Sequence, residues 1–167
     1  MSITIRRLSL SDAETISHAF AKIGWNKPVS QYEQYVQEQQ TGTCIVLVAE
    51  EEDAFAGYLK ISFHPTYPYF KELGIPEIQD LNVLPHYRRK GIATALMDHA
   101  ESLVRKQSPL VGIGVGLHPG YNAAQRLYVI RGYIPDARGV SWQGAYIREG
   151  QHLIADDGLV LHLIKKL

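Results

Sequence analysis

The chain has 167 residues, of which 46% are hydrophobic and 20% charged, and its 17 basic side chains balance 17 acidic ones. This length and composition are typical of a globular protein with its own core, so we expect one domain over residues 1–167. The zero net charge argues against a nucleic-acid coat or a polybasic membrane binder. There is no apolar signal core at the N-terminus and no apolar run long enough to span a bilayer, so a cytoplasmic location is the default expectation.

The reactive side chains show no disulfide or metal pattern. Cys44 is the only cysteine, which excludes an internal disulfide framework, and its apolar neighbours predict a buried thiol rather than a nucleophile. The seven histidines form no His-x-x-x-His pair and no cluster with the cysteine. We therefore expect no metal site.

The first third of the chain predicts a strand, two helices and a hairpin. Residues 3–8 alternate between apolar and polar side chains, as a half-buried strand does. A helix follows, with a capping box expected between Ser11 and Glu14. A second helix over residues 32–40 has only a thin apolar stripe and is a candidate wall for an acceptor substrate. Residues 43–50 are strongly β-branched, an acidic turn follows, and residues 56–63 return as a second strand, which predicts the hairpin.

Two segments contain aromatic side chains without a regular pattern. Residues 64–70 also contain two prolines, which prevent regular structure throughout the run. This segment is either a packed surface loop or an aromatic rim for an acceptor. After Pro135, a glycine-dotted excursion with Trp142 and Tyr146 is expected to be a loop or a hairpin, before a last strand at residues 159–164.

The centre of the sequence predicts a strand, a basic turn and a helix. Residues 78–83 alternate as a strand does, and Pro85 ends that strand because proline has no N–H to donate. Residues 88–91 form the turn, with three cations before a glycine. Apolar residues then recur at helical spacing to about residue 106.

This turn has the features of a phosphate-binding site. The first N–H groups of a helix lack intrahelical partners, and the helix dipole attracts negative charge. Gly91 lets the backbone approach a ligand closely, and Arg88, Arg89 and Lys90 add positive charge. The alternative is a solvated basic loop that only caps a helix. The spacing matches neither a Walker A loop nor a dinucleotide fingerprint, which both require more glycines.

The same stretch resembles a known family. Leu-x-Val-x-Pro at residues 81–85, followed by Arg-x-x-Gly-x-Ala at residues 88–93, is similar to the acyl-CoA motif of the GCN5-related N-acetyltransferases, the GNAT family. In that family the motif reads Gln/Arg-x-x-Gly-x-Gly/Ala and lies at a strand–helix junction. The predicted order of strand, turn and helix agrees with this position.

A second resemblance lies further along the chain. Residues 110–117 predict a strand with glycine at every second position, which leaves one face open to a ligand or another backbone. The helix after it resembles the second GNAT signature, Asn-x-x-Ala-x-x-Leu-Tyr-x-x-x-Gly-Phe/Tyr, from Ala124 to Tyr133. The family's asparagine position falls on Tyr121, and Asn122 lies one residue late.

The resemblance implies an α/β fold, namely the single-domain acyl-CoA N-acyltransferase (GNAT) fold, with a central mixed, mostly antiparallel sheet flanked by helices on both faces. It implies transfer of the acetyl group of acetyl-CoA directly to a primary amine of a small molecule or a protein, without a metal. The acceptor is unidentified, no nucleic acid or membrane partner is expected, and a homodimer is compatible with the sequence. Two alternatives are a non-catalytic acyl-CoA sensor on the same fold and a nucleotide-binding module unrelated to CoA.

The resemblance also implies where the cofactor binds. The backbone around Val83 would line the pantetheine, and an amide near it would polarise the thioester carbonyl. Amides from Arg89 to Thr94 would bind the pyrophosphate. The complete expected set is Leu81, Val83, Arg88, Arg89, Lys90, Gly91, Ile92, Ala93, Thr94, Asn122 and Tyr128.

Acid–base roles follow in part from the same resemblance. By family position, Tyr128 is the acid that protonates the departing CoA thiolate. For the base that deprotonates the amine, we name Glu77 first and Asp80 second, each acting through water, and His118 as an alternative. A period of two places Glu77 and Asp80 on opposite faces of the strand, so both can face one cleft only if a bulge interrupts it.

Overall fold

The computed structural model describes residues 2–167, which form two compact units. The first unit contains the described residues up to Ser62 together with Ile78–Leu103. The second contains Phe63–Glu77 and Val104–Leu167. Among the described residues, no helix is both long and apolar enough to cross a membrane.

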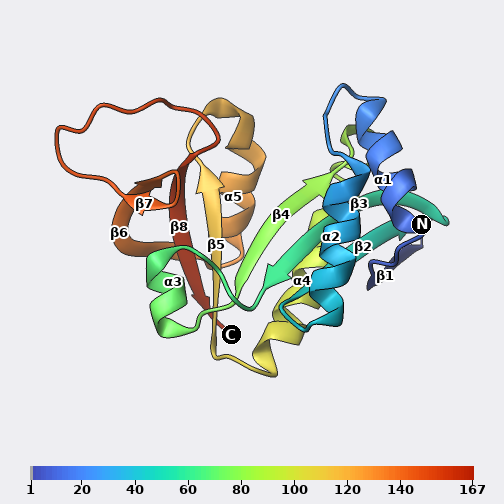
Figure 1. Cartoon of the computed structure of the whole chain (residues 1–167), viewed down its shortest axis with the longest axis horizontal. Coiled ribbons are helices and arrows are strands. Elements are labelled where there is room, and N and C mark those ends of the chain that lie inside the picture. The colour runs from blue at the N-terminus through green and yellow to red at the C-terminus, as the bar shows by residue number, and fades with distance from the viewer. Residues whose placement is uncertain (1) are drawn as a thin grey trace. The chain divides into compact units, whose positions relative to one another are not determined.

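Four neighbouring strands form the sheet of the first unit, in the order β1 (Ile3–Arg7), β2 (Cys44–Glu51), β3 (Ala54–Ser62) and β4 (Glu77–Val83) (Figure 1). β1 is antiparallel to β2, and β2 is antiparallel to β3. Nearly every residue of β2 is buried, because its continuous apolar run suits a strand that is covered on both faces. The antiparallel pairing of β2 with β3 confirms the predicted hairpin.

Three helices cover these strands: α1 (Asp12–Ala21), α2 (Val29–Gln40) and α4 (Ile92–Arg105). α1 and α2 pack against each other, and in Figure 1 they lie in front of the strands while α4 lies behind them. The core between α1, α2 and the strands includes Ile16, Phe20, Tyr32 and Tyr58, all of which are almost fully buried.

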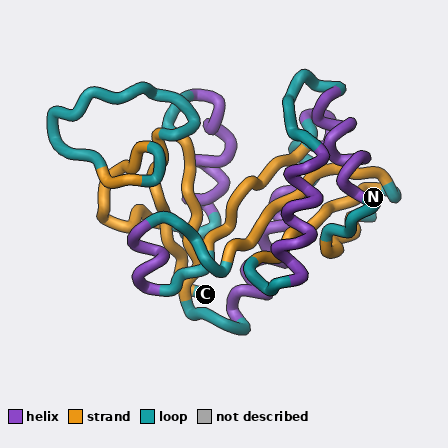
Figure 2. Tube along the Cα trace, in the orientation of Figure 1, coloured by secondary structure: helices purple, strands orange, loops and turns teal. Residues whose placement is uncertain are grey.

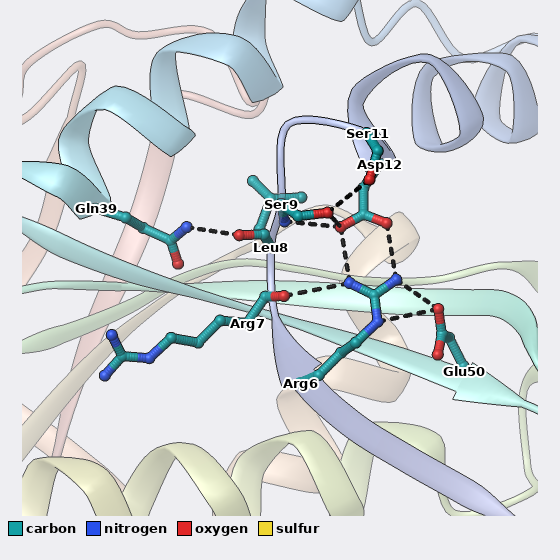
Figure 3. A network of polar contacts seen from close by, with 8 residues as sticks. All are labelled: Arg6, Arg7, Leu8, Ser9, Ser11, Asp12, Gln39 and Glu50. Atoms are coloured by element: carbon teal, nitrogen blue, oxygen red, sulfur yellow. Dashed lines mark hydrogen bonds and ion pairs between the residues drawn. The ribbon is translucent and has the colours of Figure 1, made fainter.

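Arg6 ties the first strand to α1 and to β2 (Figure 3). Its guanidinium donates to both carboxylate oxygens of Asp12, at 2.7 and 2.8 Å, and to the carboxylate of Glu50. These hydrogen bonds, first with Asp12 and then with Glu50, raise the pKa of Arg6. The capping box expected at Ser11 is wrong, since Ser11 has helical dihedral angles and makes no capping bond. Asp12 instead accepts from the backbone and the hydroxyl of Ser9.

The second unit contains strands in the order β5 (Leu110–Gly116), β8 (Leu159–Lys166), β6 (Ile134–Trp142) and β7 (Ala145–Tyr146). Neighbouring strands in this row are antiparallel. Its helices are α3 (Pro68–Leu73), the short 3-10 helix η2 (Pro119–Tyr121) and α5 (Asn122–Ile130). Figure 2 shows the long loop that joins β7 to β8.

The aromatic run at residues 64–70 is half loop and half helix. Pro68 starts α3, where its missing N–H leaves no helical hydrogen bond unmade. Tyr67 and Phe70 are 3% and 0% exposed and pack with Ile75 in a small core of their own. The interpretation as an aromatic rim for an acceptor is therefore wrong for these two rings.

Rings of the same unit fill the bare face of the glycine strand β5. A Cβ atom on Gly112 would lie 2.4 Å from the Phe70 ring, and one on Gly116 would lie 2.2 Å from the Tyr121 ring. Glycine is needed at both positions because a side chain there would displace a ring. The close approach that the sequence predicts is thus explained by ring packing.

Candidate functional site

A strand, a turn and a helix follow one another where the sequence predicts the phosphate site. β4 ends at Val83, the 3-10 helix η1 (Pro85–Tyr87) follows, and α4 begins after the basic turn. Arg89 and Gly91 both have positive φ, 61° and 83°. Two left-handed residues so close together can turn successive N–H groups toward one side, which is the geometry of anion-binding nests. The first amides of α4, from Ile92 to Thr94, have no acceptor within the helix and extend this set of donors.

The three cations of the turn are all exposed, but they do different things. The Lys90 ammonium lies 2.9 Å from a carboxylate oxygen of Glu51, and this contact raises the pKa of Lys90. Nε of Arg88 donates to the carbonyl oxygen of Val83 at 3.2 Å, which ties the turn to the end of β4. Arg88 and Lys90 therefore stabilise the conformation of the turn and also add positive charge. Arg89 has the left-handed backbone conformation.

Asp80 lies at the centre of a polar cluster in the first unit. Its φ is 53°, so the backbone leaves the extended conformation here, and simple alternation along β4 is interrupted. Its carboxylate accepts hydrogen bonds from five side chains, which are Lys27 at 3.2 Å, Gln31 at 3.1 Å, Tyr35 at 3.1 Å, Tyr58 at 2.5 Å and Asn82 at 2.7 Å.

The phenols of the Asp80 cluster act as hydrogen-bond donors at neutral pH. Burial, and after it the negative charge of Asp80, raises the pKa of both Tyr35 and Tyr58. Because a carboxylate offers about four lone-pair sites, the five donors saturate Asp80. Such an arrangement suits a fixed anion that holds a cation. It suits a base that must receive a proton less well.

Glu77, the first residue of β4, belongs to the second unit and lies in a buried environment there. Its Oε1 is 3.7 Å from Nε2 of His162. The His162 ring stacks on Tyr67, with centroids 3.5 Å apart, and its Nδ1 is 3.4 Å from the hydroxyl of Ser141. Burial lowers the pKa of His162 to about 4, against the opposing charge of Asp136, so the imidazole beside Glu77 is neutral at pH 7.

His162 is expected to make the stability of the protein depend on pH. Its pKa is lower in the folded state than the ordinary value of about 6.5, so the unfolded chain binds the proton first as the pH falls. The contribution of neutral His162 to the free energy of unfolding is complete above pH 6.5 and is lost as the pH falls from 6.5 to 4. Between pH 7 and 5 the wild type should lose about 2 kcal/mol of unfolding free energy that His162→Phe does not lose.

Urea unfolding at the two pH values measures this difference. His152→Gln, a substitution at an exposed histidine, is the matched control and should follow the wild type. Equal losses in the wild type and in His162→Phe would contradict the prediction.

His118 is poorly arranged to serve as a base. Its Nδ1 accepts from the Gly120 amide at 3.1 Å, so the proton of the neutral ring lies on Nε2. That atom is 2.8 Å from Asp157, and the hydrogen bond with His118 is the main cause of the lowered pKa of Asp157. Both nitrogens of His118 are thus already engaged in holding the turn before α5.

Tyr128 and Asn122 lie on α5, as the second motif predicts. Tyr128 is 5% exposed, and burial raises its pKa, so its hydroxyl keeps its proton at neutral pH. Asn122 is exposed, and its Oδ1 accepts from the Ala123 amide at 2.6 Å. The structure thus gives Tyr128 the protonation state that a general acid requires.

The predicted residues are divided between the two units. The first contains the basic turn, Asp80 and the half-buried Leu81 and Val83. The second contains Glu77, Asn122 and Tyr128. Sequence reasoning missed the partners of Asp80, because Lys27, Gln31, Tyr35 and Tyr58 lie 22 to 53 residues away along the chain and belong to no motif. Within residues 2–167, no group of histidine, cysteine and acidic side chains is arranged to hold a metal ion.

The fold and the turn define the class of protein, an α/β protein with a basic turn between a strand and a helix. The model of the acetyltransferase (GNAT) family matches residues 9–133, which is most of the chain. The chain therefore belongs to the GNAT family, as its two motifs indicate. No curated protein matches it by sequence.

Solved structures agree with this fold. The PaiA N-acetyltransferase of Thermoplasma acidophilum, in complex with coenzyme A, is 19% identical with a TM-score of 0.68, and both chains are covered completely. A ribosomal-protein-alanine N-acetyltransferase from Brucella melitensis is 19% identical with a TM-score of 0.70, covering 98% of this chain and 99% of its own. The protein yncA of Salmonella typhimurium, with its cofactor acetyl-CoA, is 18% identical with a TM-score of 0.69, covering 99% and 94%. The predicted GNAT fold is confirmed.

Proposed function

We propose that this chain is an N-acetyltransferase that transfers the acetyl group of acetyl-CoA directly to a primary amine of a small molecule or a protein. The proposal treats residues 1–167 as one acetyltransferase domain. It is carried by the turn after β4, where left-handed Arg89 and Gly91 precede the first amides of α4 in a chain of the GNAT family. The coenzyme A in the PaiA structure and the acetyl-CoA in the yncA structure support the choice of cofactor.

The residues of the turn fit a coenzyme A pyrophosphate. Amides from Arg89 to Thr94 would donate to its oxygens, and the guanidinium of Arg89 would add a charge-assisted bond. The backbone around Val83 would line the pantetheine, and Leu81 and Asn122 complete the proposed set. Acetyl-CoA supplies a thioester whose carbonyl carbon an amine can attack.

Two proton movements accompany the transfer in this proposal. Tyr128 gives its proton to the departing thiolate, for which its raised pKa keeps it protonated in advance. Glu77 takes the proton of the amine through water, and the imidazole of His162 beside it is neutral at pH 7. Asp80, saturated with donors, holds a cation rather than taking the proton.

Arg89→Glu is expected to weaken acetyl-CoA binding tenfold or more, because it replaces a charge-assisted bond of about 1.5–3 kcal/mol with repulsion. Calorimetry with acetyl-CoA measures the dissociation constant. Lys106→Glu makes the same charge change at an exposed site after α4 and should bind like the wild type. Equal affinities in the two variants would contradict the role of the turn.

Thiol release from acetyl-CoA with a panel of primary amines tests the reaction itself. Stimulation of thiol release by at least one amine is the expected result. Tight acetyl-CoA binding without turnover for any amine would instead identify a non-catalytic acyl-CoA sensor. A rise in melting temperature with ATP but none with coenzyme A would overturn both and indicate a nucleotide-binding module.

A further inference from the structure

The ammonium group of Lys27 lies among groups that recognise a cation. Its Nζ is 3.2 Å from Oδ1 of Asp80 and 3.0 Å from the hydroxyl oxygen of Tyr58. It also lies 5.5 Å from the centroid of the Phe20 ring, within reach of its π face, and 5.6 Å from that of the Tyr58 ring, beyond the hydroxyl edge of that ring. One carboxylate, one phenol oxygen and one ring face thus surround a single ammonium.

From these contacts we propose that the Asp80 cluster is a binding site for an unbranched primary alkylammonium, and that Lys27 occupies it as a tethered stand-in which the acceptor displaces. That the occupant is the acceptor rests on the proposed function. The ammonium site itself rests only on contacts within the first unit. In this view Lys27 competes with the acceptor amine for Asp80 and Tyr58.

The frame around the ammonium is fixed before any ligand arrives. Tyr58 donates its proton to Oδ2 of Asp80, so its oxygen presents lone pairs to the ammonium. Tyr32 donates to the same phenol at 3.3 Å, and Phe20 meets the Tyr58 ring edge to face. Tyr58, Tyr32 and Phe20 are all 0% exposed. A site whose groups are already held in place loses little conformational entropy on binding.

The occupant is held less firmly than the frame. Lys27 belongs to the connection between α1 and α2, whereas the frame comes from α1, α2, β3 and β4. The side chains of Lys27 and Asp80 are 17% and 22% exposed, so water reaches the ion pair. A competing ammonium of similar chemistry can therefore reach Asp80 from the exposed side and replace Lys27.

The contacts also select the chemical class of the ligand. Two oxygens at 3.0 and 3.2 Å from the nitrogen require N–H donors, which a quaternary ammonium lacks. The tether shows that four methylene groups fit the approach to the site, because they form the lysine side chain. The class is therefore a primary ammonium on an unbranched alkyl chain, as in a linear diamine or a lysine side chain.

Chemical rescue of Lys27→Ala tests the site without relying on activity. The probe is n-butylammonium, which has the four carbons and the charge of a whole lysine side chain. We expect millimolar n-butylammonium to raise the melting temperature of Lys27→Ala by several degrees, while n-butanol and tetramethylammonium leave it unchanged. The wild type should show a much smaller response, since its site is filled.

Matched variants decide what a response means. Lys22→Ala removes an exposed lysine from the same connection and should show no rescue. The double variant Lys27→Ala with Asp80→Asn should show no rescue. If Lys27→Ala does not fold, Lys27→Ser is used in its place. No rescue in a folded Lys27 variant, or equal rescue with tetramethylammonium, would overturn the inference.

The two proposals fail separately. If the site is the acceptor's, Lys27→Ala should lower the KM for a linear diamine, whose second amine stays free to react, about tenfold in the thiol-release assay. A lysine-containing peptide and a free diamine, tested side by side, distinguish a protein acceptor from a small one. Rescue without turnover for any amine would support the ammonium site and overturn the proposed function. Turnover without rescue would leave the function and overturn the site.

Discussion

Tyr128→Phe is expected to bind acetyl-CoA as tightly as the wild type and to turn over at least a hundredfold more slowly. The substitution keeps the buried ring and removes only the hydroxyl, and a positioned general acid contributes typically 10²- to 10⁴-fold. Because burial raises the pKa of Tyr128, the wild-type hydroxyl is protonated throughout the neutral range and the loss should not depend on pH there. Calorimetry gives the affinity, and the initial rate of thiol release gives the turnover.

Tyr146→Phe is the matched control for this prediction, because Tyr146 is a tyrosine of the same unit that is 47% exposed. It should keep the wild-type rate. A Tyr128→Phe rate within about twofold of the wild type would show that the thiolate departs without this acid. A loss of acetyl-CoA affinity in Tyr128→Phe would instead assign the hydroxyl to binding.

Gly57→Ala is expected to have the largest effect on stability. A Cβ atom at Gly57 would lie 2.6 Å from the carbonyl oxygen of Asn82 and 3.1 Å from Cα of Val83, which are backbone atoms of the neighbouring strand. Backbone cannot rotate away as a side chain can, so β4 must shift, and overpacking of this kind costs about 3 kcal/mol. Since Val83 precedes the basic turn, acetyl-CoA affinity should fall as well.

Gly74→Ala provides the comparison. Gly74 has a φ of 64° with open space around its Cβ position, so alanine there meets only the backbone strain of about 1 kcal/mol. Urea unfolding of both variants should therefore give the larger loss for Gly57→Ala by about 2 kcal/mol. A smaller loss for Gly57→Ala than for Gly74→Ala would mean that β4 gives way easily.

Local patterns predicted the elements that carry the motifs. The alternation before Pro85 and the glycine in the turn led to β4, the turn and α4, and all three are present. The Leu-Tyr pattern led to α5, with Tyr128 buried upon it. Local signals misled at Ser11, which makes no capping bond while Asp12 accepts from Ser9, and at Pro68, where α3 begins inside the aromatic run. At Ser11 a local hydrogen bond of Asp12 decided the outcome, and in the aromatic run the burial of Tyr67 and Phe70 did.

The sequence by itself determined the family, the basic turn between β4 and α4 and the position of the proposed acid, because each depends on residues close together in the chain. Only the tertiary structure decided the environment of each charge. It surrounded Asp80 with five donors, tied Lys90 to Glu51, and placed the neutral His162 beside Glu77. Apart from the hydrogen bond of Asn82, two residues from Asp80, these contacts join residues 22 to 85 positions apart. Whether a carboxylate holds a cation or takes a proton depends on such neighbours, and no spacing along the chain specifies them.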